Sequence, residues 1–470
     1  MSVSLPLVGR ATLRSRAGWG SCDLCACAHF INDKDCTTPT PSPSPQGGGE
    51  LLAHRCTLCL GRASATPAPL KKTPQVLWGD DMKSMRMMAV AAAAFCAAGA
   101  AQAQEPLKIG MITTLSGPGG YLGQDIRDAF QLAIDMQGGK LGGVPVQVLV
   151  EDDGLKPGQG KQISEKFMKT DKVKLLTGIV FSNVALAVVP DVLEEGGIYV
   201  SPNAGPSTLA GKECHANYYV VSWQNDSLHE SAGSNANNLG YKKAFILAPN
   251  YPAGKDALEG FKRTFKGDVI GEVFTKLDQN DFAAEIAQIR AAKPDFIFQF
   301  HPGGAGIAFL RQYQQAGLLE QIPMVVPSPS MDAVTLKAIG EAAVGVNVSA
   351  QWNSDFDNAA NKAFVDAWMK KYNRPITYYA SQGFDTALAI GAALKQTGGK
   401  VDDAKAFRTA MLKADFASVR GNFKFGNNQH PVQDWYSMKV VKGADGAPII
   451  KTNGKISSNT GDFYAKDCKL

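Results

Sequence analysis

Apolar strand-like segments alternate with amphipathic helical segments along most of this chain, and this alternation restricts its fold more than any other feature. Apolar segments lie at 107–115, 144–154, 173–180 and 198–201, with helical patterns at 124–139 and 181–197 between them, and the same order returns from 242 to 327. Near-continuous apolar strands between helices indicate parallel sheets that are covered on both faces. We therefore predict an α/β protein with two successive series, which meet around 218–227.

The last third of the chain has a different pattern. A strand at 344–352 leads into segments that are mainly helical from about 358 to 413, and "VRGNFKFGNNQHPVQDWYSMKVV" follows. A chain that returns to helices after a finished second series is expected to cross back to the first domain.

Residues 82–103 have the three parts of a secretory signal peptide. Lys83 and Arg86 precede the apolar run 87–101, and the small-x-small site Ala101-Gln102-Ala103 follows. A membrane span is the alternative, but it needs about 20 apolar residues and this run is shorter. Cys96 would suit a lipid anchor, although the bulky Phe95 stands before it. We predict export to the periplasm with cleavage after Ala103.

Residues 1–81 therefore precede the expected start of the protein at Met82. They contain the low-complexity stretch "TTPTPSPSPQGGGE" and six of the nine cysteines: Cys22, Cys25, Cys27, Cys36, Cys56 and Cys59. The two C-x-x-C pairs suggest zinc, but the distance between them exceeds the usual 15–20 residues. We interpret 1–81 as a spurious, disordered extension and predict no metal. A peptide from this range in the native protein would contradict that interpretation.

Removal of residues 1–103 from the 470 leaves 367 residues, enough for two domains. The removed part carries four of the five net positive charges, so the composition gives no argument for nucleic-acid binding. Two cysteines remain, Cys214 and Cys468. In an exported chain they suggest one disulfide, and two free buried thiols are the alternative.

Small and hydroxylated residues follow the predicted strands. The segments are "SGPGGYLG", "FSN" and "PNAGPS" in the first series and "PNYPAGKD", "HPGGAG" and "PSPSMD" in the second. Ligands of open parallel sheets bind beyond the carboxyl ends of the strands. Backbone amides at helix N-termini can hold an anion there, and the interspersed aromatic residues can hold an apolar body. The same residue types also form ordinary turns.

Enzyme motifs are absent from the sequence. "GPGGYLG" departs from G-x-G-x-x-G, there is no phosphate-binding P-loop or G-x-S-x-G elbow, and the histidines are scattered. "EDD" at 151–153 is better explained as a solvated strand end than as a metal site. We predict that the protein is not an enzyme and uses no cofactor.

These segments together resemble the periplasmic substrate-binding proteins of branched-chain amino-acid-type ABC transporters, over essentially all of 105–470. The resemblance rests on "IGMITTLSGPGGYLGQDIRDAFQLAID", "YVSPNAGPSTL", "NYPAGKDALEGFK", "FHPGGAGIAFLRQYQQAGL" and "YYASQGFDTALAIGAAL". It implies a type I periplasmic-binding fold, in which two Rossmann-like lobes close on the ligand about a three-segment hinge. It also implies docking on an inner-membrane permease with cytoplasmic ATPases.

The resemblance assigns roles to individual residues. Ser182 and Asn183 would bind the carboxylate of a ligand, and backbone groups of Asn203, Ala204 and Gly205 would assist. The remaining positions are Ser116 and Tyr121 at the mouth of the cleft, Tyr251 and Gly254 of a Y-x-x-G motif, and His301 and Gly303 in the second lobe.

One departure bears on the ligand. Amino-acid binders of this family carry an acidic residue for the ammonium in the loop that is "PSPSMD" here, where only Asp332 follows. We therefore expect a small carboxylate without an ammonium group, and the sequence looks closer to the aromatic-acid branch. The alternative is a branched-chain amino acid or amide whose amine is bound by an acidic residue outside this loop, for example by Asp385.

The expected organisation is one lobe from 105–223 with 354–436 and another from 224–353 with 437–470. We predict a monomeric binding protein of an ABC importer with no nucleic-acid partner. The alternative from another functional class is a ligand sensor domain, which would regulate rather than transport.

Overall fold

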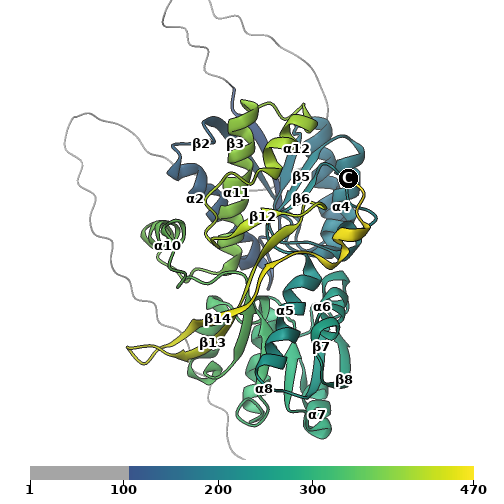
Figure 1. The fold of residues 1–470 in the computed structure, drawn as a ribbon, viewed down its shortest axis with the longest axis vertical. Helices are drawn as coiled ribbons and strands as arrows, with labels where there is room; N and C mark the ends of the chain where they lie inside the picture. The colour runs from purple at the N-terminus through teal and green to yellow at the C-terminus, as the bar shows by residue number, and fades with distance from the viewer. Residues whose placement is uncertain (1–104) are drawn as a thin grey trace, which may run out of the picture. The chain divides into compact units, whose positions relative to one another are not determined.

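The computed structural model describes residues 105–470, so the predictions for the signal peptide and for 1–81 lie outside the described residues. The first sheet along the chain has six strands, in the order β2-β3-β1-β4-β5-β6. Figure 1 labels β2, β3, β5 and β6 of this sheet. Every neighbouring pair is parallel except β2 with β3. The strands are β1 (Leu107–Thr113), β2 (Lys140–Leu141), β3 (Val144–Asp152), β4 (Leu175–Thr177), β5 (Ile198–Ser201) and β6 (Tyr218–Val220).

Helices from both ends of the described chain accompany this sheet. They are α2 (Gly120–Met136), α3 (Pro157–Glu165), α4 (Ser182–Glu194), α10 (Ala359–Tyr372), α11 (Tyr378–Thr397) and α12 (Ala404–Leu412). A Cβ on Gly383 of α11 would lie 2.2 Å from the Ile126 carbonyl of α2, so glycine permits this close helix crossing. We call the six-stranded sheet with these helices the first lobe.

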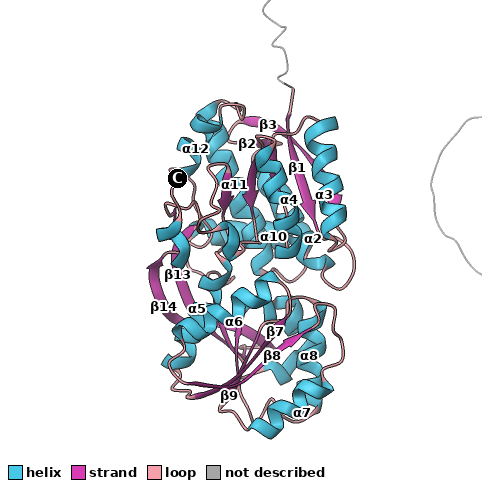
Figure 2. Ribbon diagram, turned by 90° about the vertical axis from the view of Figure 1, so that its right-hand side faces the viewer, coloured by secondary structure: helices cyan, strands magenta, loops and turns pink. Residues whose placement is uncertain are grey.

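The second sheet has eight strands in the order β12-β13-β11-β10-β9-β7-β8, and β14 pairs with β13. Its strands are β7 (Lys243–Pro249), β8 (Asp268–Thr275), β9 (Phe296–Gln299), β10 (Met324–Pro327), β11 (Asn347–Ala350), β12 (Phe423–Phe425), β13 (Pro431–Lys442) and β14 (Pro448–Thr460). Its helices are α5 (Asn225–Asn238), α6 (Pro252–Thr264), α7 (Ala283–Ala292), α8 (Gly304–Gln315) and α9 (Ala333–Ile339). Figure 2 labels α5, α6, α7 and α8. This sheet with these helices is the second lobe.

Short helical turns complete the elements: a π-helical turn at Lys166–Thr170 and 3₁₀ turns at Ser207–Leu209, Ser328–Ser330, Gly340–Ala343 and Phe463–Asp467. The predicted α/β alternation with two parallel series is confirmed. Helix α3 was missed, because two of its nine residues are glycines and only Gly160 and Ser164 are buried, which leaves little apolar periodicity. Among residues 105–470, no helix has the length and apolar character needed to span a bilayer.

The chain passes between the lobes at 221–224 and again at 351–358, and β13 with β14 lies against both passages. Gln433 Nε2 donates to the Ser222 carbonyl at 2.9 Å, and Asn353 Nδ2 donates to the Ile450 carbonyl at 3.0 Å. These bonds bring three chain segments together, which supports the proposed hinge.

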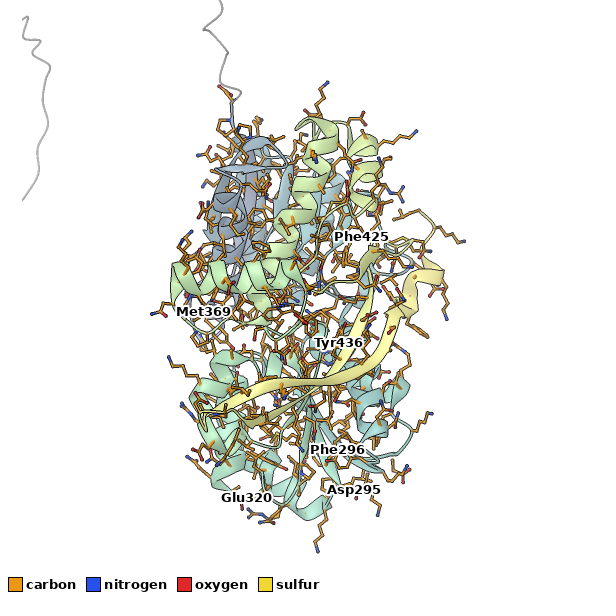
Figure 3. The ribbon with its side chains drawn as sticks, turned by 60° about the vertical axis from the view of Figure 1, so that its left-hand side comes forward. Asp295, Phe296, Glu320, Met369, Phe425 and Tyr436 are labelled. Carbon is orange, nitrogen blue, oxygen red and sulfur yellow. A yellow bond between two sulfur atoms is a disulfide. The ribbon has the colours of Figure 1, made fainter. Side chains whose placement is uncertain are left out.

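The lobe boundaries given above remain a proposal. In the β12–β13 region the backbone pairing and the side-chain contacts point to different lobes. The ladder of this region belongs to the second sheet, although 423–436 falls in the range assigned to the first lobe. A side chain of β12 nevertheless contacts the first lobe, because the Phe425 ring lies 6.2 Å from the Tyr219 ring. Figure 3 labels Phe425 in β12 and Tyr436 in β13.

Cys214 and Cys468 form the predicted disulfide, with their Cα atoms 5.7 Å apart across 254 residues. The bond ties the C-terminal tail to the loop that precedes β6. We expect Cys468→Ser to lower the free energy of unfolding by about 2–4 kcal/mol, since a long closed loop restricts the unfolded chain. Urea unfolding of the variant checks this, with the reduced wild type as control. An unchanged midpoint in both would contradict it.

Candidate ligand-binding site

A small cavity lies between the lobes beyond the carboxyl ends of β4, β5, β7 and β9. Aromatic and small side chains from both lobes line it: Val180, Phe181, Ser182, Asn203, Trp223, Asn225, Leu228, His229, Tyr251, Ala253, Phe300, Pro302, Pro329 and Tyr379. Its free volume is about 20 Å³, close to the space of one water molecule. A ring-sized ligand therefore enters only if the lobes separate and the lining rings shift.

Four rings form a row along this cavity. Phe181 at the start of α4 lies 6.4 Å from Tyr251, centroid to centroid, and Tyr251 lies 6.3 Å from Phe300 in a stacked arrangement. The His229 ring of α5 meets Phe300 edge-on at 4.7 Å. The row begins in the first lobe and ends in the second, so an aromatic ligand between them would contact both lobes.

Four helices begin at the cavity: α4, α5, α6 and α11. Helix α4 starts at Ser182, and α6 starts at Pro252, which is followed by the lining residue Ala253. The N-terminal turn of a helix has free amides and a partial positive charge, which suit an anion. The Ser182 hydroxyl accepts a hydrogen bond from Asn225 Nδ2 at 3.1 Å, so its own proton remains available to a ligand.

Among residues 105–470, no Asp, Glu, Lys or Arg lines the cavity. The acidic groups near it bridge the lobes instead. Tyr121 donates to Asp332 Oδ2 at 2.8 Å, and the Thr335 amide donates to Asp332 Oδ1 at 2.7 Å. Burial raises the pKa of Asp332, and both of its oxygens are occupied by protein donors.

Asp256 forms a second bridge between the lobes. Its carboxylate accepts from the Ser207 hydroxyl at 2.6 Å, from the Ser207 amide at 3.1 Å and from Asn225 Nδ2 at 2.9 Å. Burial raises the pKa of Asp256 to about 6, and the charge of Asp226 adds to this. These bridges show that the described arrangement is a closed one, with the two lobes in direct contact.

The cavity brings together three of the residues proposed from sequence: Ser182, Asn203 and Tyr251. Asn203 Nδ2 donates to the Val180 carbonyl at 2.7 Å, which leaves Oδ1 without a protein partner. Asn183, the next residue of α4, is half-buried and does not line the cavity.

Other proposed residues have partners elsewhere. The Ala204 amide donates to the Ile179 carbonyl, and the Gly205 amide donates to Asn225 Oδ1 at 3.2 Å, so neither is free for a ligand. A Cβ on Gly205 would lie 2.1 Å from the Trp223 carbonyl, which shows why this position is glycine. Ser116 is exposed in the loop after β1.

His301 faces the core of the second lobe. Its Nε2 pairs with the Thr275 hydroxyl at 3.0 Å and its Nδ1 with Gln299 Oε1 at 2.9 Å. Gly303 precedes α8 with φ +69°, and its neighbour Gly304 donates to the Pro118 carbonyl of the first lobe at 3.1 Å. These positions contribute to packing and lobe contact rather than to the cavity lining.

Asp385 lies away from the cavity. Its oxygens accept from the Ser418 hydroxyl at 2.6 Å, from the Val419 amide at 3.0 Å and from Arg420 Nε at 3.0 Å. Both partners of the ion pair are buried. This arrangement leaves no oxygen of Asp385 for the amine of a ligand.

Sequence reasoning missed most of the lining residues, among them Trp223, His229, Phe300 and Tyr379. A signal existed for Phe300, because successive side chains of a strand point to opposite faces. His301 occupies the core face, so its neighbour Phe300 faces the cavity.

A larger cavity of about 600 Å³ lies between α9 and β14 of the second lobe and α10 of the first. Its lining is mainly apolar and includes Met331, Leu336, Met369 and Ile376. Ala333 at the start of α9 lines it, but it contains none of the residues that were assigned to the ligand from sequence, and the row of four rings is not part of its lining. We therefore place the candidate site in the smaller cavity, where the strand ends, helix starts and rings converge.

The family model named "Periplasmic binding protein" matches residues 106–446. This chain belongs to that family. A relative, Leu/Ile/Val-binding protein homolog 6 of Brucella melitensis biotype 1, is 28% identical over 380 residues, which cover 78% of this chain and 95% of the relative. The type I periplasmic-binding fold predicted from sequence is thereby confirmed.

Two solved structures are also similar. A solute-binding protein of an ABC transporter from R. palustris in complex with benzoate is 33% identical, with a TM-score of 0.73 over 78% of this chain and 100% of that chain. One from Rhodopseudomonas palustris BisB5 in complex with 3,4-dihydroxybenzoic acid is 28% identical, with a TM-score of 0.71 over 77% and 99%. The protein is a periplasmic solute-binding component of an ABC transporter, a class that carries small molecules to a membrane permease and its ATPase.

Proposed function

We propose that this binding protein captures an aromatic carboxylate between its two lobes. The observation that carries the proposal is a cavity lined by aromatic rings and helix starts, in which no described residue contributes an Asp, Glu, Lys or Arg side chain. The carboxylate would lie at the start of α4 beside Ser182, and the ring would lie along the row of Phe181, Tyr251 and Phe300.

The absence of an acidic lining residue separates this ligand from an amino acid. An ammonium group buried without a carboxylate partner would carry a large desolvation cost. A carboxylate alone needs only amide and hydroxyl donors, which helix starts provide. The neighbours that bind benzoate and 3,4-dihydroxybenzoic acid support this reading, and the relative named Leu/Ile/Val-binding makes an amino acid the rival ligand.

Binding would be coupled to lobe closure. A ligand that touches Ser182 of the first lobe and Phe300 of the second makes all its contacts only when the lobes meet, so it shifts the population toward the closed form. We infer that the closed monomer then docks on the permease. Export by residues 82–103 with cleavage after Ala103 stays part of this proposal.

Thermal unfolding with added ligand tests the proposal. We expect benzoate to raise the melting temperature and leucine to leave it unchanged, since a ligand at 100-fold its dissociation constant stabilises by about 2.7 kcal/mol. Isoleucine, an amide and a dicarboxylate serve as controls. A shift with leucine and none with benzoate would reject the aromatic acid in favour of the amino acid.

A further inference from the structure

Two polar atoms in the wall of the candidate cavity have no hydrogen-bond partner in the part of the chain that the structure describes. They are Nδ1 of His229, a residue that is 1% exposed, and Oδ1 of Asn203, a residue that is 8% exposed. The Asn203 amide nitrogen already donates to the Val180 carbonyl, so its free atom can only accept a hydrogen bond. Buried polar groups are normally paired, so a ligand with a hydrogen-bond donor would complete this site.

His229 lies at the end of the cavity opposite the start of α4. Asn225, which contacts Ser182, is four residues earlier on α5, so one helical turn, roughly 6 Å, separates Asn225 from His229. The row of rings has the same direction, from Phe181 through Tyr251 and Phe300 to His229. This separation is close to the distance from the carboxyl carbon to the hydroxyl oxygen of a para-hydroxylated benzoate.

The His229 imidazole is neutral in this setting. It is packed edge-on against Phe298 and Phe300, and burial lowers its pKa to about 3. A neutral imidazole has one N–H donor and one acceptor nitrogen, and a hydroxyl can pair with either of them because it both donates and accepts. A carboxylate has no proton to donate, so it cannot satisfy Asn203 Oδ1 or an accepting imidazole nitrogen.

We propose that His229 recognises a hydroxyl group on the ring of the ligand, para to the carboxylate, so that the site prefers para-hydroxylated aromatic acids to unsubstituted ones. The inference rests on the proposed function and names the substrate class of the same site. His229 acts here by direct contact with the ligand and determines specificity.

Calorimetric titration with benzoate, 4-hydroxybenzoate, 3-hydroxybenzoate and 4-methoxybenzoate tests this. The wild type should bind 4-hydroxybenzoate about tenfold more tightly than benzoate, the usual gain from one added hydrogen bond to a buried group. His229→Phe keeps a ring but removes the nitrogens, so this ratio of the two affinities should fall to about one. The variant should fold, because Nδ1 makes no bond to the protein.

His430 provides a matched control. It is also fully buried with one unpartnered ring nitrogen, but it lies against Tyr218 of the first lobe and outside the cavity. His430→Phe should therefore keep the tenfold ratio. In the wild type, 4-methoxybenzoate cannot donate and should lose the advantage, which tests the inference even without a folded variant.

Equal affinities of the wild type for benzoate and 4-hydroxybenzoate would overturn the inference. So would a preference that survives in His229→Phe, or one that favours the 3-hydroxy acid. Each of these outcomes leaves the aromatic acid as ligand intact. Failure of all four acids to bind would instead reject the proposed function, so the two failures can be told apart.

Discussion

Asp385→Ala is expected to lower the free energy of unfolding by about 3–5 kcal/mol, because it leaves the guanidinium of Arg420 buried without its counter-ion. The pair is 3.0 Å apart, and Asp385 and Arg420 are 0% and 4% exposed. Arg420 also donates to the Ser222 carbonyl at 3.0 Å and to Gln433 at 2.7 Å, so it joins α11 to two of the segments that connect the lobes. Urea unfolding measures the loss.

An exposed ion pair is the control for this result. Asp135 of α2 pairs with Lys371 of α10, and both side chains are about two-fifths exposed. Asp135→Ala should cost no more than about 1 kcal/mol, as surface pairs do. If Asp385 instead met the amine of a ligand, Asp385→Asn would abolish amino-acid binding and leave stability unchanged. That outcome would restore the rival ligand.

The fold followed from sequence because its cause is local. Each strand of a parallel sheet is a short apolar run and each covering helix has apolar residues at helical spacing, so periodicity alone located most elements. Helix α3 was not predicted, because Gly158 and Gly160 weaken the apolar periodicity of its sequence. The pairing of β12 and β13 with the second sheet was not predicted either. The sheet that a strand joins depends on contacts between residues far apart in the chain, which periodicity does not report.

The candidate site was predictable only where a residue directly follows a strand. Ser182, Asn203 and Tyr251 follow β4, β5 and β7, and all three line the cavity. The error at β9 was one of register: His301 was chosen, and its neighbour Phe300 faces the cavity. His229 and Tyr379 lie within helices, where no strand end marks them, and only the packing of the lobes brings them to the site.

Gly304→Val is expected to weaken ligand binding by about 10- to 100-fold, or roughly 1.4–2.8 kcal/mol, with little change in melting temperature. A Cβ at Gly304 would lie 2.7 Å from Cβ of Pro118, which belongs to the other lobe. The clash exists only when the lobes meet, so it penalises the closed form and leaves each lobe intact. Apparent affinity then falls with the fraction of closed protein. Titration calorimetry with the best aromatic acid measures it.

Gly306, two residues later in α8, separates this effect from damage to the helix. A Cβ there would lie 2.2 Å from the His301 carbonyl within the same lobe, so Gly306→Ala should lower the melting temperature. The fraction of Gly306→Ala that stays folded should bind the ligand with nearly wild-type affinity, whereas Gly304→Val should bind it weakly. Small-angle scattering should show compaction on ligand addition for Gly306→Ala and none for Gly304→Val. Wild-type affinity in Gly304→Val would mean that binding does not require the contact between α8 and the loop after β1, and closure would then need another explanation.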